Sequence, residues 1–168
     1  MLPGNGLPLA GGDTGEPTQP LASRPAAAVR IVRGVVRLLT SLDYRSLTEF
    51  PLPDGRRADV VAIDARGAFA IVEVKSSLAD FRSDGKWPCY RAFCDSFYFA
   101  VAPGFPLDLL PGDAGVIIAD AFEAVVLRRP PIVVLNPGRR RALLLRFARA
   151  ASARLTLVAD PEFAGGRG

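Results

Sequence analysis

The stretch that decides the fold runs from Phe69 to Lys75 and reads Phe-Ala-Ile-Val-Glu-Val-Lys. Five of its seven residues are apolar and three are β-branched, a pattern typical of a strand buried on both faces. The turn sequence Ala65-Arg66-Gly67 precedes it. Alternate residues of a strand point to the same face, so Glu73 and Lys75 emerge side by side at its end. The sequence therefore predicts a buried strand that ends in a carboxylate and an ammonium group.

A second predicted strand, residues 58–64, lies just upstream of that turn. In an antiparallel hairpin its start lies beside the end of the next strand, which places Asp59 next to Glu73 and Lys75. Two interpretations stay open. Glu73 and Lys75 can form an ordinary ion pair that contributes little to stability. Alternatively, Asp59, Glu73 and the backbone carbonyl of Val74 hold Mg²⁺ or Mn²⁺, because two neighbouring carboxylates repel each other unless a cation or proton lies between them.

The arrangement of Asp59 followed by Glu73-Val74-Lys75 resembles the signature of the PD-(D/E)XK nuclease superfamily, with Ala58 in place of the proline of that name. Longer segments are similar to the MmcB-like DNA-repair family of bacteria, and the resemblance covers roughly residues 28–156. These segments are residues 71–81, Lys86-Trp87-Pro88 with Tyr90, residues 93–101 and residues 110–120.

The resemblance implies a restriction-endonuclease-like α/β sandwich, with a mixed central sheet flanked by helices. It implies that Asp59, Glu73 and Lys75 are catalytic. In related nucleases a polar residue of the following helix reaches back to the metal, which makes Lys86 and Tyr90 further candidates; a solvated lysine and a packed tyrosine are the alternative. Many such nucleases carry one more acidic residue, and Glu49 is the candidate for it.

The composition excludes several classes of protein. The chain has 168 residues, 49% of them apolar, and no apolar run is long enough to span a membrane. It contains no histidine, which excludes Ser-His-Asp hydrolysis, phosphohistidine chemistry and metal sites built on histidine. Cys89 and Cys94 have no zinc-site spacing, and residues 1–24 lack the features of a signal peptide. A reduced, cytoplasmic protein without a membrane partner is expected.

The pattern along the chain predicts one domain, residues 26–157, between a disordered tail at 1–25 and a C-terminal tail at 158–168. Helices are expected from Ala26 and after Ser77, the second broken by Gly85 and Pro88. Another helix is expected at 139–157. The further predicted strands are residues 46–52, 96–102, 115–119 and the edge strand 124–127.

Arginine dominates the C-terminal third of the chain. The net charge is +4, and eight arginines lie between Arg128 and Arg154 without one acidic residue. In the predicted helix 139–157, Leu144, Phe147, Ala148, Ala151 and Leu155 form the stripe expected to pack on the domain. The opposite stripe is expected to bind nucleic acid and consists of Arg139, Arg146, Arg149 and Arg154.

Lysine is rare by comparison: of 21 basic residues only Lys75 and Lys86 are lysine. An ammonium group of adjustable pKa suits a position beside a reacting water better than a guanidinium does. We therefore expect a Mg²⁺- or Mn²⁺-dependent deoxyribonuclease of DNA repair without strong sequence specificity, with DNA, repair proteins or a second copy as partners. The alternatives are a non-catalytic DNA-binding or scaffold module, and a nuclease acting on RNA.

Overall fold

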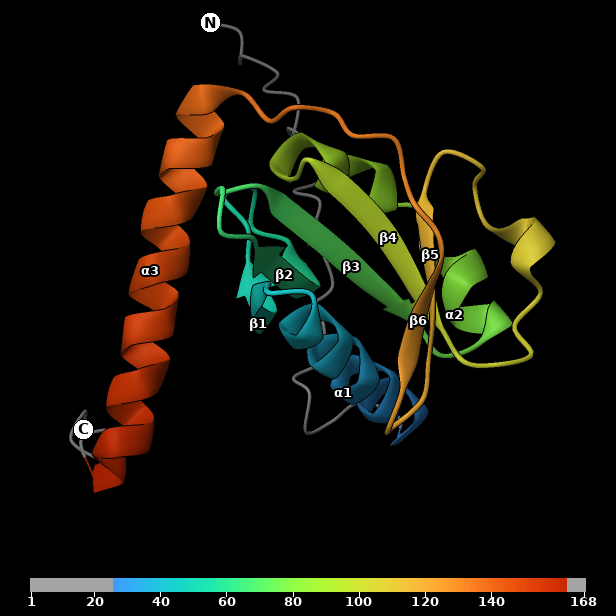
Figure 1. Cartoon of the computed structure of the whole chain (residues 1–168), viewed down its shortest axis with the longest axis horizontal. Helices are drawn as coiled ribbons and strands as arrows, with labels where there is room; N and C mark the ends of the chain where they lie inside the picture. Colours follow the sequence, from blue (N-terminus) through green and yellow to red (C-terminus); the bar gives the residue numbers. More distant parts are fainter. Residues whose placement is uncertain (1–25, 163–168) are drawn as a thin grey trace, which may run out of the picture.

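The computed structural model describes residues 26–162, and its centre is a six-stranded sheet (Figure 1). The strands lie in the order β1-β2-β3-β4-β5-β6. The pairs β3–β4 and β4–β5 are parallel, and the others are antiparallel. The bounds are β1 Arg45–Pro51, β2 Arg57–Ile63, β3 Phe69–Lys75, β4 Ser96–Val101, β5 Gly115–Ala119 and β6 Ala124–Arg128. The predicted α/β fold with a mixed central sheet is confirmed.

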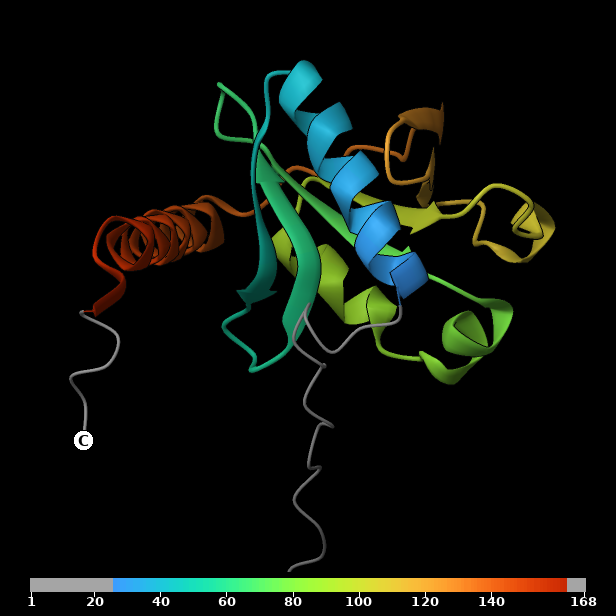
Figure 2. The ribbon, with the colours of Figure 1, turned by 90° about the horizontal axis from the view of Figure 1, so that it is seen from below.

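Helices flank both faces of this sheet (Figure 2). They are α1 Ala26–Ser41, α2 Leu78–Ser83 and α3 Pro137–Ala159, with the 3-10 helices η2 Trp87–Phe93 and η3 Leu107–Leu109. The expected break near Gly85 and Pro88 is confirmed, since α2 ends at Ser83 and η2 begins at Trp87. Within residues 26–162, no helix is long and apolar enough to cross a membrane.

Helix α1 covers one face of the sheet with the apolar side that its periodicity predicts. Ile31, Val32 and Val35 pack against a buried cluster to which β2, β3, β4 and β5 contribute. The helix comes so close to the β5–β6 turn that a Cβ atom at Gly34 would lie 2.2 Å from the backbone carbonyl oxygen of Asp120. Only glycine permits this approach without a shift of the helix.

The opposite face packs against η2, the segment before α3, and α3 itself. Its core is aromatic: the Trp87 ring stacks on Phe97 with centroids 5.6 Å apart. Phe69 and Ile71 of β3 belong to this cluster. Strand alternation therefore turns Glu73 and Lys75 toward the same layer as η2 and α2.

Helix α3 departs from the prediction in the face that it buries. It is longer than expected and reaches Ala159, where Asp160 ends it. Only Leu143 is fully buried, and Phe147 and Ala150 are half-buried against the core. The predicted packing stripe was wrong in part, because Leu144 and Leu155 are exposed and Arg154 is half-buried.

The rotation of α3 is determined by a buried carboxylate. Asp95 accepts hydrogen bonds from the backbone N–H groups of Phe69 (2.7 Å) and Leu135 (2.8 Å). Both guanidinium NH groups of Arg140 donate to it as well, at 3.0 and 2.7 Å. Burial alone would raise the pKa of Asp95, but Arg140 and these N–H groups outweigh burial and lower the pKa below its ordinary value. This anchor selects one of the two apolar stripes of α3 for packing.

Candidate functional site

The first feature of the site is the meeting of Asp59 and Glu73 at the ends of β2 and β3. The last paired residues of the ladder are Val60 and Val72, so the next position of the register brings Asp59 opposite Glu73. At this point a side chain takes the place of a backbone carbonyl as hydrogen-bond acceptor: the N–H of Val74 donates to Oδ2 of Asp59 at 2.7 Å. Both carboxylates are buried, with 3% and 6% of their residue surfaces exposed. The structure thus brings together the two residues that the hairpin pattern predicts to be neighbours.

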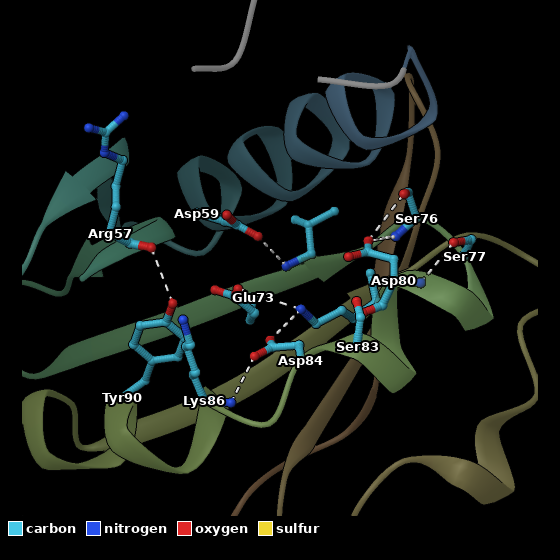
Figure 3. A network of polar contacts seen from close by, with 12 residues as sticks. Arg57, Asp59, Glu73, Ser76, Ser77, Asp80, Ser83, Asp84, Lys86 and Tyr90 are labelled. Atoms are coloured by element: carbon cyan, nitrogen blue, oxygen red, sulfur yellow. Dashed lines mark hydrogen bonds and ion pairs between the residues drawn. The ribbon is translucent and has the colours of Figure 1, made fainter. Parts of the chain in front are cut away.

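Lys75 is the cationic centre of the site, and the carboxylates of Glu73 and Asp84, both labelled in Figure 3, hold it. Its Nζ lies 3.6 Å from Oε1 of Glu73 and 2.5 Å from Oδ2 of Asp84, and the residue is 3% exposed. Burial by itself lowers the pKa of Lys75, but Glu73 and Asp84 outweigh burial and raise it above the ordinary value. Lys75 therefore remains an ammonium ion at neutral pH.

Asp84 is placed by the short helix α2. Ser77 caps this helix, as the sequence predicts, by accepting a hydrogen bond from the N–H of Asp80 at 3.1 Å. The carboxylate of Asp80 in turn accepts bonds from the N–H and hydroxyl of Ser76. Because α2 starts directly after β3 and ends at Ser83, its last residue is followed by Asp84 beside Lys75 (Figure 3). The other oxygen of Asp84 accepts the N–H of Lys86.

Asp84 is a residue of the site that the sequence analysis did not identify. Its nine-residue separation from Lys75 matches no helical or strand period. The contact depends on where α2 ends and on the turn that follows, and these boundaries are the least certain part of a sequence-based assignment. A buried lysine with two acidic residues near it in sequence was the available signal.

Tyr90 lies at the site, and Lys86 lies at its margin. The hydroxyl of Tyr90 donates to the carbonyl of Arg57 at 3.2 Å. The pKa of Tyr90 is strongly raised, first by burial and then by the charges of Glu73, Asp59 and Asp84. Lys86 is exposed, and its backbone rather than its ammonium group makes the bond to Asp84.

Glu49 lies on β1 at the register position opposite Asp59, between the paired residues Thr48–Val60 and Phe50–Ala58. Its backbone is left-handed, with φ 49°, an uncommon conformation for a residue with a side chain. A guanidinium nitrogen of Arg57 lies 3.8 Å from its carboxylate, and its side chain is 13% exposed. The three acidic residues Glu49, Asp59 and Glu73 thus occupy consecutive register positions on three neighbouring strands.

The four arginines predicted to bind nucleic acid do not form one free stripe. Arg139 donates to the carbonyl of Ala92, Arg146 to that of Pro51 and Arg154 to that of Glu49, at 3.1–3.2 Å. Arg149 is exposed and lines a shallow open groove with Arg146 and Ala150. Through these bonds α3 reaches the end of β1 next to Glu49.

Asp59 and Glu73 bring carboxylate oxygens, the ligand type that a divalent cation prefers, to neighbouring strand ends. The charges of Asp59, Glu73 and Asp84 all act on Tyr90, and Glu73 and Asp84 also hold the ammonium group of Lys75. Mg²⁺ binds through one or two carboxylates and keeps several waters, and Asp59 and Glu73 supply such oxygen atoms. Among residues 26–162, no group of three or more acidic, histidine or cysteine side chains is close enough to enclose a metal.

Fold and site together define an α/β protein with a buried cluster of carboxylates and one lysine at the ends of two paired strands. The chain belongs to the MmcB-like family, described as DNA repair proteins, whose sequence model matches residues 16–162. Among solved structures it is similar to the SPO1766 protein of unknown function from Silicibacter pomeroyi, with 40% identity and a TM-score of 0.79. The similarity covers 86% of this chain and 97% of the other. No curated protein matches.

Proposed function

We propose that this protein is a DNA-repair nuclease of the PD-(D/E)XK type that hydrolyses phosphodiester bonds with the help of Mg²⁺ or Mn²⁺. The observation that carries the proposal is the burial of Asp59, Glu73 and Lys75 at the ends of the paired strands β2 and β3. Apolar residues at these positions would avoid the free energy that burying charges costs, so the cluster is better explained by chemistry than by stability. The description of the family supports a role in DNA repair.

The residues of the site have separate roles in this proposal. Asp59, Glu73 and the carbonyl of Val74 would hold the cation, which when bound polarises the phosphate and acidifies a water. Lys75 stays protonated between Glu73 and Asp84, so its charge offsets the negative charge that grows on the phosphate during attack. Asp84 keeps the flexible lysine side chain in place.

DNA affinity would come from the arginines of α3. Arg149 and its neighbour Arg146 line an open groove, and the segment from Arg128 to Arg154 carries no acidic residue. Contacts of arginine with phosphates add affinity without reading the base sequence. Weak sequence preference and strong salt dependence are therefore expected.

One observation favours a second candidate, a non-catalytic DNA-binding module that retains the nuclease fold. Asp59, Glu73 and Lys75 are each less than one-tenth exposed, and Lys75 is already neutralised by Glu73 and Asp84. Side chains so deeply buried offer little surface to a phosphate group. Such a module would bind DNA with the same arginines and leave the strands intact.

Cleavage and metal binding distinguish the two candidates. Nicked, branched and single-stranded DNA, with RNA in parallel, are incubated with Mg²⁺ or Mn²⁺ and with wild type or Asp59→Asn. Cleavage that the substitution abolishes supports the nuclease, and DNA binding without cleavage supports the module.

Metal binding is measured independently of activity. Calorimetry with Mn²⁺ compares wild type with Glu73→Gln and with the control Glu123→Gln, whose carboxylate is exposed and lies on another strand end. The nuclease proposal expects loss of binding in the first variant alone. Equal weak heats in all three proteins would remove the metal site from the proposal.

A further inference from the structure

The two edges of the sheet differ in their protection. Beside β1 stands α3, and the guanidinium groups of Arg146 and Arg154 donate to the carbonyls of Pro51 and Glu49. β6 is the opposite edge of the sheet: among residues 26–162 it pairs with β5 on one side and with no strand on the other, and α1 packs against one of its faces. An edge strand without cover presents backbone N–H and C=O groups that can pair with another strand.

The side chains of β6 also favour pairing with another strand. Ala124 and Val126 pack toward α1, whereas Val125 and Leu127 are 57% and 54% exposed. The five residues of β6 carry one charge, that of Arg128, whose guanidinium group is already bound to the carbonyls of Ala114 and Pro111. Charged residues and prolines, which usually keep edge strands apart, are thus missing from the middle of β6, and the one irregularity in its pairing with β5 lies at Leu127, between the pairs Val116–Arg128 and Ile117–Val126.

We propose that β6 pairs with β6 of a second copy of this chain, antiparallel, around a two-fold axis through Val126. A two-fold axis perpendicular to an antiparallel pair places the central residue of one strand opposite the same residue of the other copy. With Val126 at the centre, Val125 of one copy lies opposite Leu127 of the other, and this contact occurs twice. The pairing joins two six-stranded sheets into one continuous sheet.

Charge complementarity selects this register and favours a second copy as the occupant. Glu123 and Arg129, the exposed residues just outside the two ends of β6, then lie opposite each other across the axis. Shifting the centre to Val125 or Leu127 loses both of these pairs. Opposite charges and apolar pairs at directly facing positions stabilise antiparallel strands, whereas like charges there destabilise them.

The exposed leucines of α3 form the other apolar surface that could contact a second copy. Leu144 and Leu155 are exposed, but α3 contains six arginines and no acidic residue, so α3 of a second copy offers it no opposite charge. This helix therefore supplies the matched control. Leu155 is 68% exposed, so its replacement, like that of Val125, leaves the core untouched.

Sedimentation equilibrium over a wide concentration range tests the proposal on the full chain. We expect a monomer–dimer equilibrium for wild type, at least about tenfold weaker association for Val125→Lys, and no change for Leu155→Lys. Urea midpoints of the variants confirm that each of them is folded. A wild type that stays monomeric at all concentrations overturns the proposal, and so does a dimer that Leu155→Lys disrupts while Val125→Lys does not.

A charge exchange tests the register. Glu123→Arg and Arg129→Glu each create two like-charged pairs in the symmetric dimer, so each is expected to weaken association. The double variant Glu123→Arg/Arg129→Glu restores the opposite charges and should associate within about threefold of wild type. Failure of the double variant to recover, with both single variants weakened, would overturn the register through Val126.

Discussion

Removal of the ammonium group of Lys75 is the sharpest test of how the site is held together. In Lys75→Met a side chain of similar length remains, but Glu73 and Asp84 lose the cation that lies 3.6 and 2.5 Å from them. All three side chains are largely buried, at 4%, 8% and 17% exposure for Lys75, Glu73 and Asp84. Removing one partner of a buried ion pair costs about 3–5 kcal/mol, and we expect the free energy of unfolding to fall by that amount at neutral pH.

The pH dependence of this loss has a definite sign. The pKa of Lys75 in the folded protein is raised above its ordinary 10.5. A group with a raised pKa contributes its full stability below the unfolded pKa and loses it as the pH rises through the folded one. The difference in unfolding free energy between wild type and Lys75→Met is therefore constant between neutral pH and about pH 10 and shrinks above it.

Urea unfolding followed by circular dichroism measures both quantities. Lys86→Met is the matched control, since Lys86 is exposed and only its backbone contacts the site, and its free energy should change by less than about 0.5 kcal/mol. The reasoning is refuted if Lys75→Met costs no more than Lys86→Met, or if its cost grows above pH 10.

The other predictions concern the chemistry, the DNA surface and the core. Lys75→Arg should lose most cleavage of DNA while keeping the fold and the DNA affinity, because a planar guanidinium does not fit where the compact ammonium is held; full activity would contradict this. Arg149→Gln should flatten the log–log salt dependence of duplex affinity by about 0.9, whereas the exposed control Arg66→Gln should leave the slope unchanged. Gly34→Ala should lower the free energy of unfolding by about 1–3 kcal/mol because its Cβ meets a backbone carbonyl, and Gly85→Ala, with nothing within 4 Å, should change it by less than about 1 kcal/mol.

The central hairpin shows how far local sequence information reaches. The pattern of residues 58–64 and 69–75, joined by a turn, predicted two neighbouring strands, and the register that follows from the turn brought Asp59 beside Glu73. Strand alternation placed Lys75 on the face of Glu73. These relations depend on the period of a strand and on a short loop, which are properties of the local chain.

Contacts between segments far apart in the chain were decided only by the tertiary structure. The sequence of α3 permits two apolar stripes, and the bond between Asp95 and Arg140, 45 residues apart, selects the packed one. Asp84 reaches Lys75 because α2 ends at Ser83. β6 is an edge strand because of its place in the strand order of the sheet. Periodicity describes which side of a helix or strand is apolar. Which other element packs against that side depends on how all the elements pack at once, so only the tertiary structure determines these contacts.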